Sequence, residues 1–79
     1  MIKLNILNME NFLDTVNACR DAVHMICPDG SIVDINGKER VQNSLWQQYR
    51  QNKNCLPLVL TISNPGDYMR IVSYYAGDC

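Results

Sequence analysis

The sequence predicts an α+β domain in which three helices cover one face of a four-stranded antiparallel sheet, an open-faced sandwich with the element order β-α-β-β-α-β-α. Three observations lead to this fold class. Residues 2–6 alternate apolar and polar side chains, and residues 56–63 are mostly apolar, as is typical of strands. Residues 9–27 and 41–53 carry apolar side chains at helical spacing. A chain of 79 residues supports a single domain, residues 1–79, with a small core.

The first strand is predicted in the segment IKLNIL, where every second residue is apolar. A long first helix is predicted to follow, with Asn8 as its N-cap and Glu10 in its first turn. Pro28 in the PDG segment cannot continue a helix and is expected to end it. The apolar stripe of this helix is Met9, Phe12, Leu13, Val16, Cys19, Val23, Ile26 and Cys27.

The Asn36-Gly37 pair follows the β-branched run SIVDI and predicts a hairpin with a type I′ turn. A two-residue loop would place Ile32 opposite Val41, which is favourable. It would also place Asp34 opposite Glu39, where the two negative charges repel. A bulge or a wider loop therefore remains open.

The second helix is predicted at about residues 44–52, because Val41, Leu45 and Tyr49 recur every four residues and Arg50 and Lys53 suit a helix C-terminus. The segment LPLVLTIS predicts the last strand, with its proline near the start.

A third helix is predicted to begin with Asn64 as its N-cap, Pro65 as its first helical residue and Asp67 in its first turn. The expected helix ends at Gly77. Its apolar residues are Met69, Val72, Tyr75 and Ala76.

Composition limits the function classes. The formal net charge is -1, with 47% hydrophobic and 19% charged residues, so bulk charge gives no reason to expect nucleic acid or an acidic membrane as a partner. The N-terminal segment has no long apolar stretch, and we expect a cytoplasmic protein. Four cysteines, Cys19, Cys27, Cys55 and Cys79, lack C-x-x-C spacing. They are expected to be reduced thiols, with Cys79 exposed, and no metal site or cofactor is expected.

Several of these segments together resemble the HPr family, the histidine-containing phosphocarrier proteins of the bacterial sugar phosphotransferase system. The resemblance is carried by Asn36-Gly37-Lys38, by Ser44-Leu45-Trp46, by LVLTIS and by a turn with Gly66 before the last helix. It covers nearly the whole chain and implies the same open-faced sandwich that periodicity predicts.

The chain departs from the HPr family at the phosphoryl acceptor. The resemblance implies a Gly-Leu-His-x-Arg-Pro stretch at the start of the first helix, where this chain has NFLDTV. Leu13 occupies the histidine position, Thr15 the arginine position and Val16 the proline position. Because histidine phosphorylation needs an imidazole nucleophile, we expect the phosphorelay to be lost. Leu13 continues the apolar stripe of Phe12 and Val16, so we expect its side chain to be at least partly buried. His24 is expected late in the first helix, about 16 Å from Leu13, as a surface residue.

Ser44 is a candidate regulatory phosphorylation site, because the resemblance places it at the serine that is phosphorylated in Gram-positive HPr proteins. A phosphate at a helix N-terminus would be stabilised by free N–H groups, with Arg40 nearby. The alternative is that Ser44 only caps the second helix.

Leu45, Trp46 and Tyr49 are the candidate partner-docking residues, because the resemblance implies an apolar docking surface after the serine. Trp46 is either an exposed interface anchor or part of the edge of the core. Arg50 and Lys53 beside the two aromatic residues would be the basis of an RNA site, but they match no RNA-binding signature.

No motif couples an acid or a base to a nucleophile, so we expect no enzyme activity. The expected function is that of a small HPr-like regulatory or protein-binding module without phosphohistidine transfer, whose partner is a protein. The alternative is a phosphocarrier of the sugar phosphotransferase system.

Overall fold

The computed structural model describes residues 1–78, so the expected exposure of Cys79 lies outside the described residues. The predicted fold class and the order β-α-β-β-α-β-α are confirmed. The elements are β1 (Ile2–Ile6), α1 (Met9–Asn17), β2 (Val23–Ile26), β3 (Ile32–Asp34), α2 (Glu39–Gln51), β4 (Leu56–Ile62) and α3 (Pro65–Asp78).

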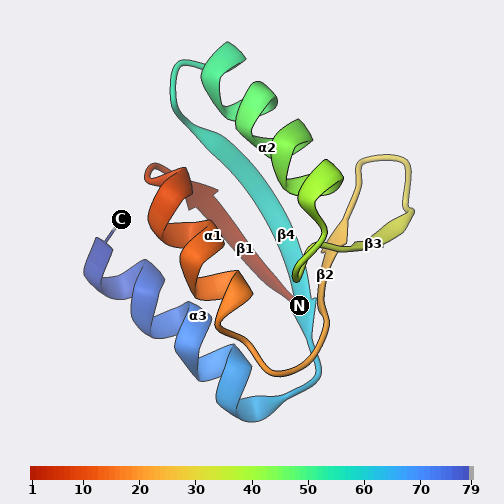
Figure 1. Ribbon diagram of the computed structural model, residues 1–79, viewed down its shortest axis with the longest axis vertical. Coiled ribbons are helices and arrows are strands. Elements are labelled where there is room, and N and C mark those ends of the chain that lie inside the picture. Colours follow the sequence, from red (N-terminus) through yellow and green to blue (C-terminus); the bar gives the residue numbers. More distant parts are fainter. Residues whose placement is uncertain (79) are drawn as a thin grey trace.

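The four strands form one antiparallel sheet in the order β1-β4-β2-β3, so β1 and β3 are its edges. Figure 1 shows the three helices in one layer in front of this sheet, with the other face of the sheet left open. Side chains alternate between the two faces of a strand. Leu4, Ile6 and Leu58 are buried beneath the helices, whereas Lys3 and Asn5 are exposed on the open face.

Pro57 lies in β4 without loss of a sheet hydrogen bond. It is opposite Asn5 of β1, and the pairing of β4 with β2 ends at Val59. The Asn5 N–H points away from β4, because it donates to the Tyr75 hydroxyl of α3 at 3.2 Å. The backbone nitrogen of Pro57 therefore faces a part of the sheet where β2 is no longer paired, which is where proline is tolerated.

The predicted first helix is wrong in its second half. α1 begins as expected, with Asn8 Oδ1 accepting from the Asn11 N–H at 3.2 Å, but it ends at Asn17. Residues 23–26 form β2, which pairs with both β3 and β4. Val23 is fully buried. An apolar residue at this position fits the buried stripe of a helix and the buried face of a strand equally well.

The predicted hairpin at Asn36-Gly37 is also wrong, and the hairpin is formed by the PDG segment between β2 and β3. A type I′ turn needs positive φ at both central residues. Gly37 has a φ of 70°, but Asn36 is not among the described residues with positive φ. The turn at residues 28–30 is closed by the Cys27 N–H, which donates to the Ser31 carbonyl at 2.8 Å. Gly30 supplies the positive φ there, 90°.

The segment after Gly37 is helical, so Ile32 does not pair with Val41. Ile32 lies opposite Ile26 instead, and α2 begins at Glu39 rather than at about residue 44. The element order is still correct because the two errors compensate. The segment predicted as one long first helix contains α1 and β2, and the segment predicted as the second strand of the hairpin belongs to α2.

One hydrophobic core fills the space between the sheet and the helices. Phe12 of α1 is fully buried and meets Tyr74 of α3, with ring centroids 5.9 Å apart. The buried apolar residues are Leu4, Ile6, Met9, Phe12, Leu13, Val16, Cys19, Val23, Ile35, Leu45, Tyr49, Leu56, Leu58, Leu60 and Ile71.

Two polar residues hold the loop between α1 and β2. Asp67, in the first turn of α3, is 2% exposed, and its carboxylate accepts from the Arg20 N–H at 3.0 Å and the Asp21 N–H at 2.9 Å. The Asn36 amide donates to the Cys19 carbonyl at 3.1 Å and to the Asp21 carbonyl at 2.7 Å. This loop is therefore fixed by residues distant in sequence.

Burial raises the pKa of the Cys19 thiol, and the nearby Asp67 carboxylate raises it further.

The start of α3 is confirmed as predicted. Asn64 Oδ1 accepts from the Gly66 N–H at 2.8 Å and from the Asp67 N–H at 3.1 Å, and Pro65 is the first helical residue. An asparagine N-cap followed by proline and an acid satisfies the free donors of a helix start.

We predict that acid destabilises the fold through Asp67. Hydrogen bonds from the Arg20 and Asp21 N–H groups lower the pKa of this carboxyl in the folded state. Its stabilising effect is present above the unfolded pKa of about 3.9 and is lost as the pH falls toward the folded pKa. Thermal denaturation followed by circular dichroism should show a lower midpoint as the pH decreases below about 5.

The Asp67→Asn variant should be less stable at neutral pH and should depend less on pH between about 5 and 3. Some dependence should persist, because a hydrogen bond from Ser31 also lowers the pKa of the Asp29 carboxyl. Asp14→Asn, at an exposed aspartate of α1, is the control and should leave the midpoint at neutral pH nearly unchanged. A wild-type pH profile in the Asp67 variant would contradict this role.

Candidate functional site

The start of α2 is attached to the end of α1. The Gln42 amide donates to Asn17 Oδ1 at 2.7 Å and to the Ile35 carbonyl at 2.8 Å. The Gly37 N–H also donates to Asn17 Oδ1, at 3.1 Å. These bonds fix how α2 sits on the domain and therefore which of its side chains reach solvent.

Ser44 does not open the second helix, which corrects the expected N-terminal site. Ser44 lies inside α2, and Lys38 occupies the N-cap position without a side-chain hydrogen bond. The Ser44 side chain is exposed, and its Oγ accepts from Gln48 Nε2 at 3.2 Å. A phosphate on Ser44 would therefore not meet the free N–H groups of a helix start. It would lie one helical turn after Arg40, a spacing at which side chains on a helix interact.

Two of the three candidate docking residues belong to the core. Leu45 is 1% exposed and Tyr49 is 9% exposed. The Tyr49 hydroxyl donates to the Leu7 carbonyl at 2.6 Å, which ties α2 to the segment after β1. Because their surface is already buried, Leu45 and Tyr49 offer a partner little apolar area.

Trp46 lies at the rim of the core and is partly exposed. Its ring meets Tyr49 edge to face, with centroids 5.7 Å apart. The Arg50 guanidinium lies over the same ring, 5.1 Å from its centroid. This geometry is that of a cation–π contact. The solvent-facing residues of the candidate surface are therefore Ser44 on one flank of α2 and Trp46 and Arg50 on the other. We call these three residues the α2 surface.

Leu13 is 5% exposed, as predicted from its place in the apolar stripe. Val16, which the suggested resemblance aligns with the proline of HPr proteins, is fully buried. Thr15, which the suggested resemblance aligns with the arginine of HPr proteins, donates its hydroxyl to the Asn11 carbonyl at 2.8 Å. The segment is thus an ordinary amphipathic helix whose inner side is packed against the core.

His24 lies in β2 and not near the end of a helix, which corrects the predicted location. It is opposite Asp34 of β3 and Thr61 of β4. Because its neighbour Val23 is buried beneath the helices, the His24 side chain points to the open face of the sheet. The sheet therefore separates His24 from α1.

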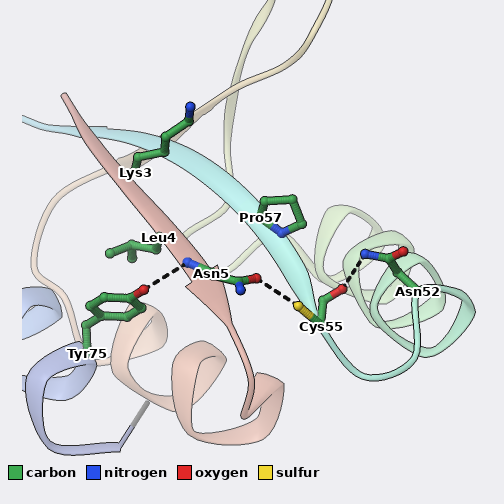
Figure 2. A pocket seen from close by; sticks show the side chains of 7 residues that line it. All are labelled: Lys3, Leu4, Asn5, Asn52, Cys55, Pro57 and Tyr75. Carbon is green, nitrogen blue, oxygen red and sulfur yellow. Dashed lines mark hydrogen bonds between the residues drawn. The ribbon is translucent and has the colours of Figure 1, made fainter.

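Sequence reasoning did not anticipate a depression beside the β1 edge. Figure 2 shows Tyr75 of α3 on one side of Asn5 and Cys55 on the other. Cys55 Sγ donates to Asn5 Oδ1 at 2.9 Å, and the Cys55 carbonyl accepts from Asn52 Nδ2 at 2.7 Å. The depression is open to solvent and has a volume of about 490 Å³, and its other lining residues are Lys3, Leu4 and Pro57. Asn5 and Cys55 are 50 residues apart, so no local motif could reveal their contact.

Metal ligands do not gather in the part of the chain that the structure describes. Within residues 1–78, no three His, Cys, Asp or Glu side chains are placed to share an ion. Cys19, Cys27 and Cys55 are free thiols. No helix in the same residues has the length and apolar content needed to span a membrane.

Comparison with protein-family models, curated proteins and solved structures gave no match for this chain. The site must therefore be interpreted from its own geometry.

Proposed function

We propose that this chain is a cytoplasmic, HPr-like regulatory or protein-binding module that does not transfer phosphate through histidine. The burial of Leu13 is the observation that carries the proposal, because a phosphoryl acceptor must be reachable by the protein that donates the phosphate. A leucine side chain packed into the core supplies neither a nucleophile nor a ligand for phosphate oxygens.

A phosphocarrier role would have to use His24, the single histidine of the chain. Its place on the open face puts the sheet between it and the α1 segment that resembles the family's acceptor site. The arrangement therefore favours protein binding over phosphoryl transfer, and we propose no enzyme activity.

The α2 surface is the proposed docking site. Trp46 retains exposed ring area while its packing against Tyr49 and Arg50 restricts its rotamers, so little conformational entropy is lost when a partner binds. Aromatic residues and arginine are typical anchors of protein interfaces. The formal charge of -1 gives no general attraction to nucleic acid or acidic lipid, so we propose a protein as the partner.

Phosphorylation of Ser44 is proposed as the regulatory event at this surface. A phosphate would bring nearly two negative charges to the flank of α2 opposite Trp46, since residues two apart lie about 200° round a helix. Burying these charges in an interface that extends over both flanks would be costly. Arg40, four residues earlier on the same helix, would compensate part of the charge in the free protein. Modification should therefore weaken docking while leaving the fold intact.

Affinity capture with the immobilised protein tests this proposal. We expect Trp46→Ala and Ser44→Asp to reduce capture of the same specific partner by at least about tenfold, which corresponds to about 1.4 kcal/mol. Tyr68→Ala, which removes a 37% exposed aromatic side chain from α3, is the matched control and should retain the partner. Circular dichroism should show folded protein in all three variants.

Full capture by the Trp46 variant would show that the α2 surface is not the docking site. Loss of capture by the Tyr68 control alone would move the site to α3. Labelled phosphate transferred to the protein from phosphoenolpyruvate by the first enzyme of the phosphotransferase system would instead support the phosphocarrier alternative.

A further inference from the structure

The open face of the sheet carries an apolar row that no helix covers. Lys3, Val59, Ile26 and Ile32 lie in register across all four strands. Ile32 is 62% exposed, and Ile26 and Val59 are partly exposed. A neighbouring row contains Thr61, His24 and Asp34. We call these seven residues the open-face patch.

We propose that the open-face patch associates with the same patch of a second copy of this chain. The apolar residues lie on the two inner strands and on β3, while the charged residues lie at opposite edges, Lys3 on β1 and Asp34 on β3. A patch with its positive charge at one edge and its negative charge at the other is complementary to its own two-fold copy.

The two-fold axis that fits this arrangement is parallel to the strands and passes between β4 and β2. It places β1 of one copy over β3 of the other and β4 over β2, so that Val59 meets Ile26 in the centre. Lys3 then lies over Ile32 of the other copy. Asp34 is two residues further along β3 and therefore lies about 7 Å from Ile32. The long Lys3 side chain can bridge this distance.

The edges of the sheet are less suited to association than its face. The Asn5 N–H on the free side of β1 already donates to the Tyr75 hydroxyl. β3 is only three residues long, so it offers few backbone groups for strand addition. These features favour face-to-face packing over a continuous sheet.

The patch is small, and we therefore expect a weak dimer. Four strands spaced about 4.8 Å apart and two or three rows of residues cover roughly 20 Å by 14 Å. This is well below the about 800 Å² per partner that a standard stable interface buries. The dissociation constant should therefore lie in the micromolar range or above. The proposal does not depend on the α2 surface.

Sedimentation velocity of the full chain from about 10 µM to about 1 mM tests the dimer. We expect the weight-average sedimentation coefficient to rise with concentration. Ile32→Glu should weaken association at least about tenfold, because it places a charge in the apolar row. Met69→Glu, which adds the same charge at a 57% exposed position of α3, should leave association unchanged.

A charge exchange tests the two-fold arrangement separately. Lys3→Glu and Asp34→Lys should each weaken the dimer, and the double variant should restore it to within about threefold. Because Asp34 Oδ1 also accepts from the Asn36 N–H at 3.0 Å, thermal denaturation should verify that each variant is folded. A chain that stays monomeric to about 1 mM would overturn the proposal, as would equal weakening by the Met69 control. Failure of the double variant to recover would overturn the two-fold arrangement.

Discussion

Replacing Leu13 with alanine should lower the free energy of unfolding by about 2 to 4 kcal/mol. Leu13 is 5% exposed and lies in the core beside Phe12 and Val16, so the substitution removes buried methyl groups and leaves a cavity. Chemical denaturation with urea measures the effect directly, with an unchanged slope showing that the unfolding transition is the same.

Leu7→Ala is the matched control for this substitution. It makes the same chemical change at a leucine that is 50% exposed, and it should alter stability by no more than about 0.5 kcal/mol. A loss of less than about 0.5 kcal/mol in the Leu13 variant would mean that the position is open to solvent. Leu13 would then not be part of the core, although its side chain would still supply no nucleophile for phosphate.

Replacing Leu45 with alanine should lower the free energy of unfolding by about 2 to 5 kcal/mol. Leu45 is 1% exposed on the inner side of α2, although the resemblance suggested it as a docking residue. The effect should appear in urea denaturation of the isolated protein, without any partner present.

Gln47→Ala, at an exposed position of the same helix, is the control and should leave stability within about 0.5 kcal/mol of the wild type. If Leu45→Ala weakened partner capture without a loss of stability, Leu45 would belong to the interface and the division between core and α2 surface would be wrong.

The first helix shows where sequence patterns become ambiguous. Its N-cap, first turn and buried stripe through Val16 were predictable from local signals and are confirmed. The stripe continues through Val23 and Ile26 at helical spacing, but these residues also fit a strand, with Val23 beneath the helices and Ile26 on the open face. What ends α1 is tertiary, because Asp67 and Asn36 bind the backbone of the following loop.

The Asn36-Gly37 pair misled for a related reason. The dipeptide is a strong hairpin signal, yet here the Asn36 side chain is occupied by the backbone carbonyls of Cys19 and Asp21. These partners are 15 or more residues away, so no local window contains them. By contrast, the N-cap of α3 is formed by neighbouring residues, Asn64, Pro65 and Asp67, and could be predicted from the local sequence.

The candidate site was predictable only in outline. Helical spacing places Leu45 and Tyr49 on one side of α2 and Trp46 beside them, and the structure agrees. The predicted position of Ser44 depends on where the second helix begins, and that start depends on where the hairpin is placed. His24 likewise changed face and element once residues 23–26 formed a strand.

A phosphoryl-transfer assay tests whether this chain lacks phosphohistidine chemistry. The purified chain would be incubated with labelled phosphoenolpyruvate and the first enzyme of the sugar phosphotransferase system, with an HPr protein as the positive control. Because Leu13, which the proposed resemblance places at the histidine of HPr proteins, is buried and has no nucleophile, we predict that HPr is labelled and this chain is not. Acid-labile phosphate on His24 would show that the chain is a phosphocarrier instead.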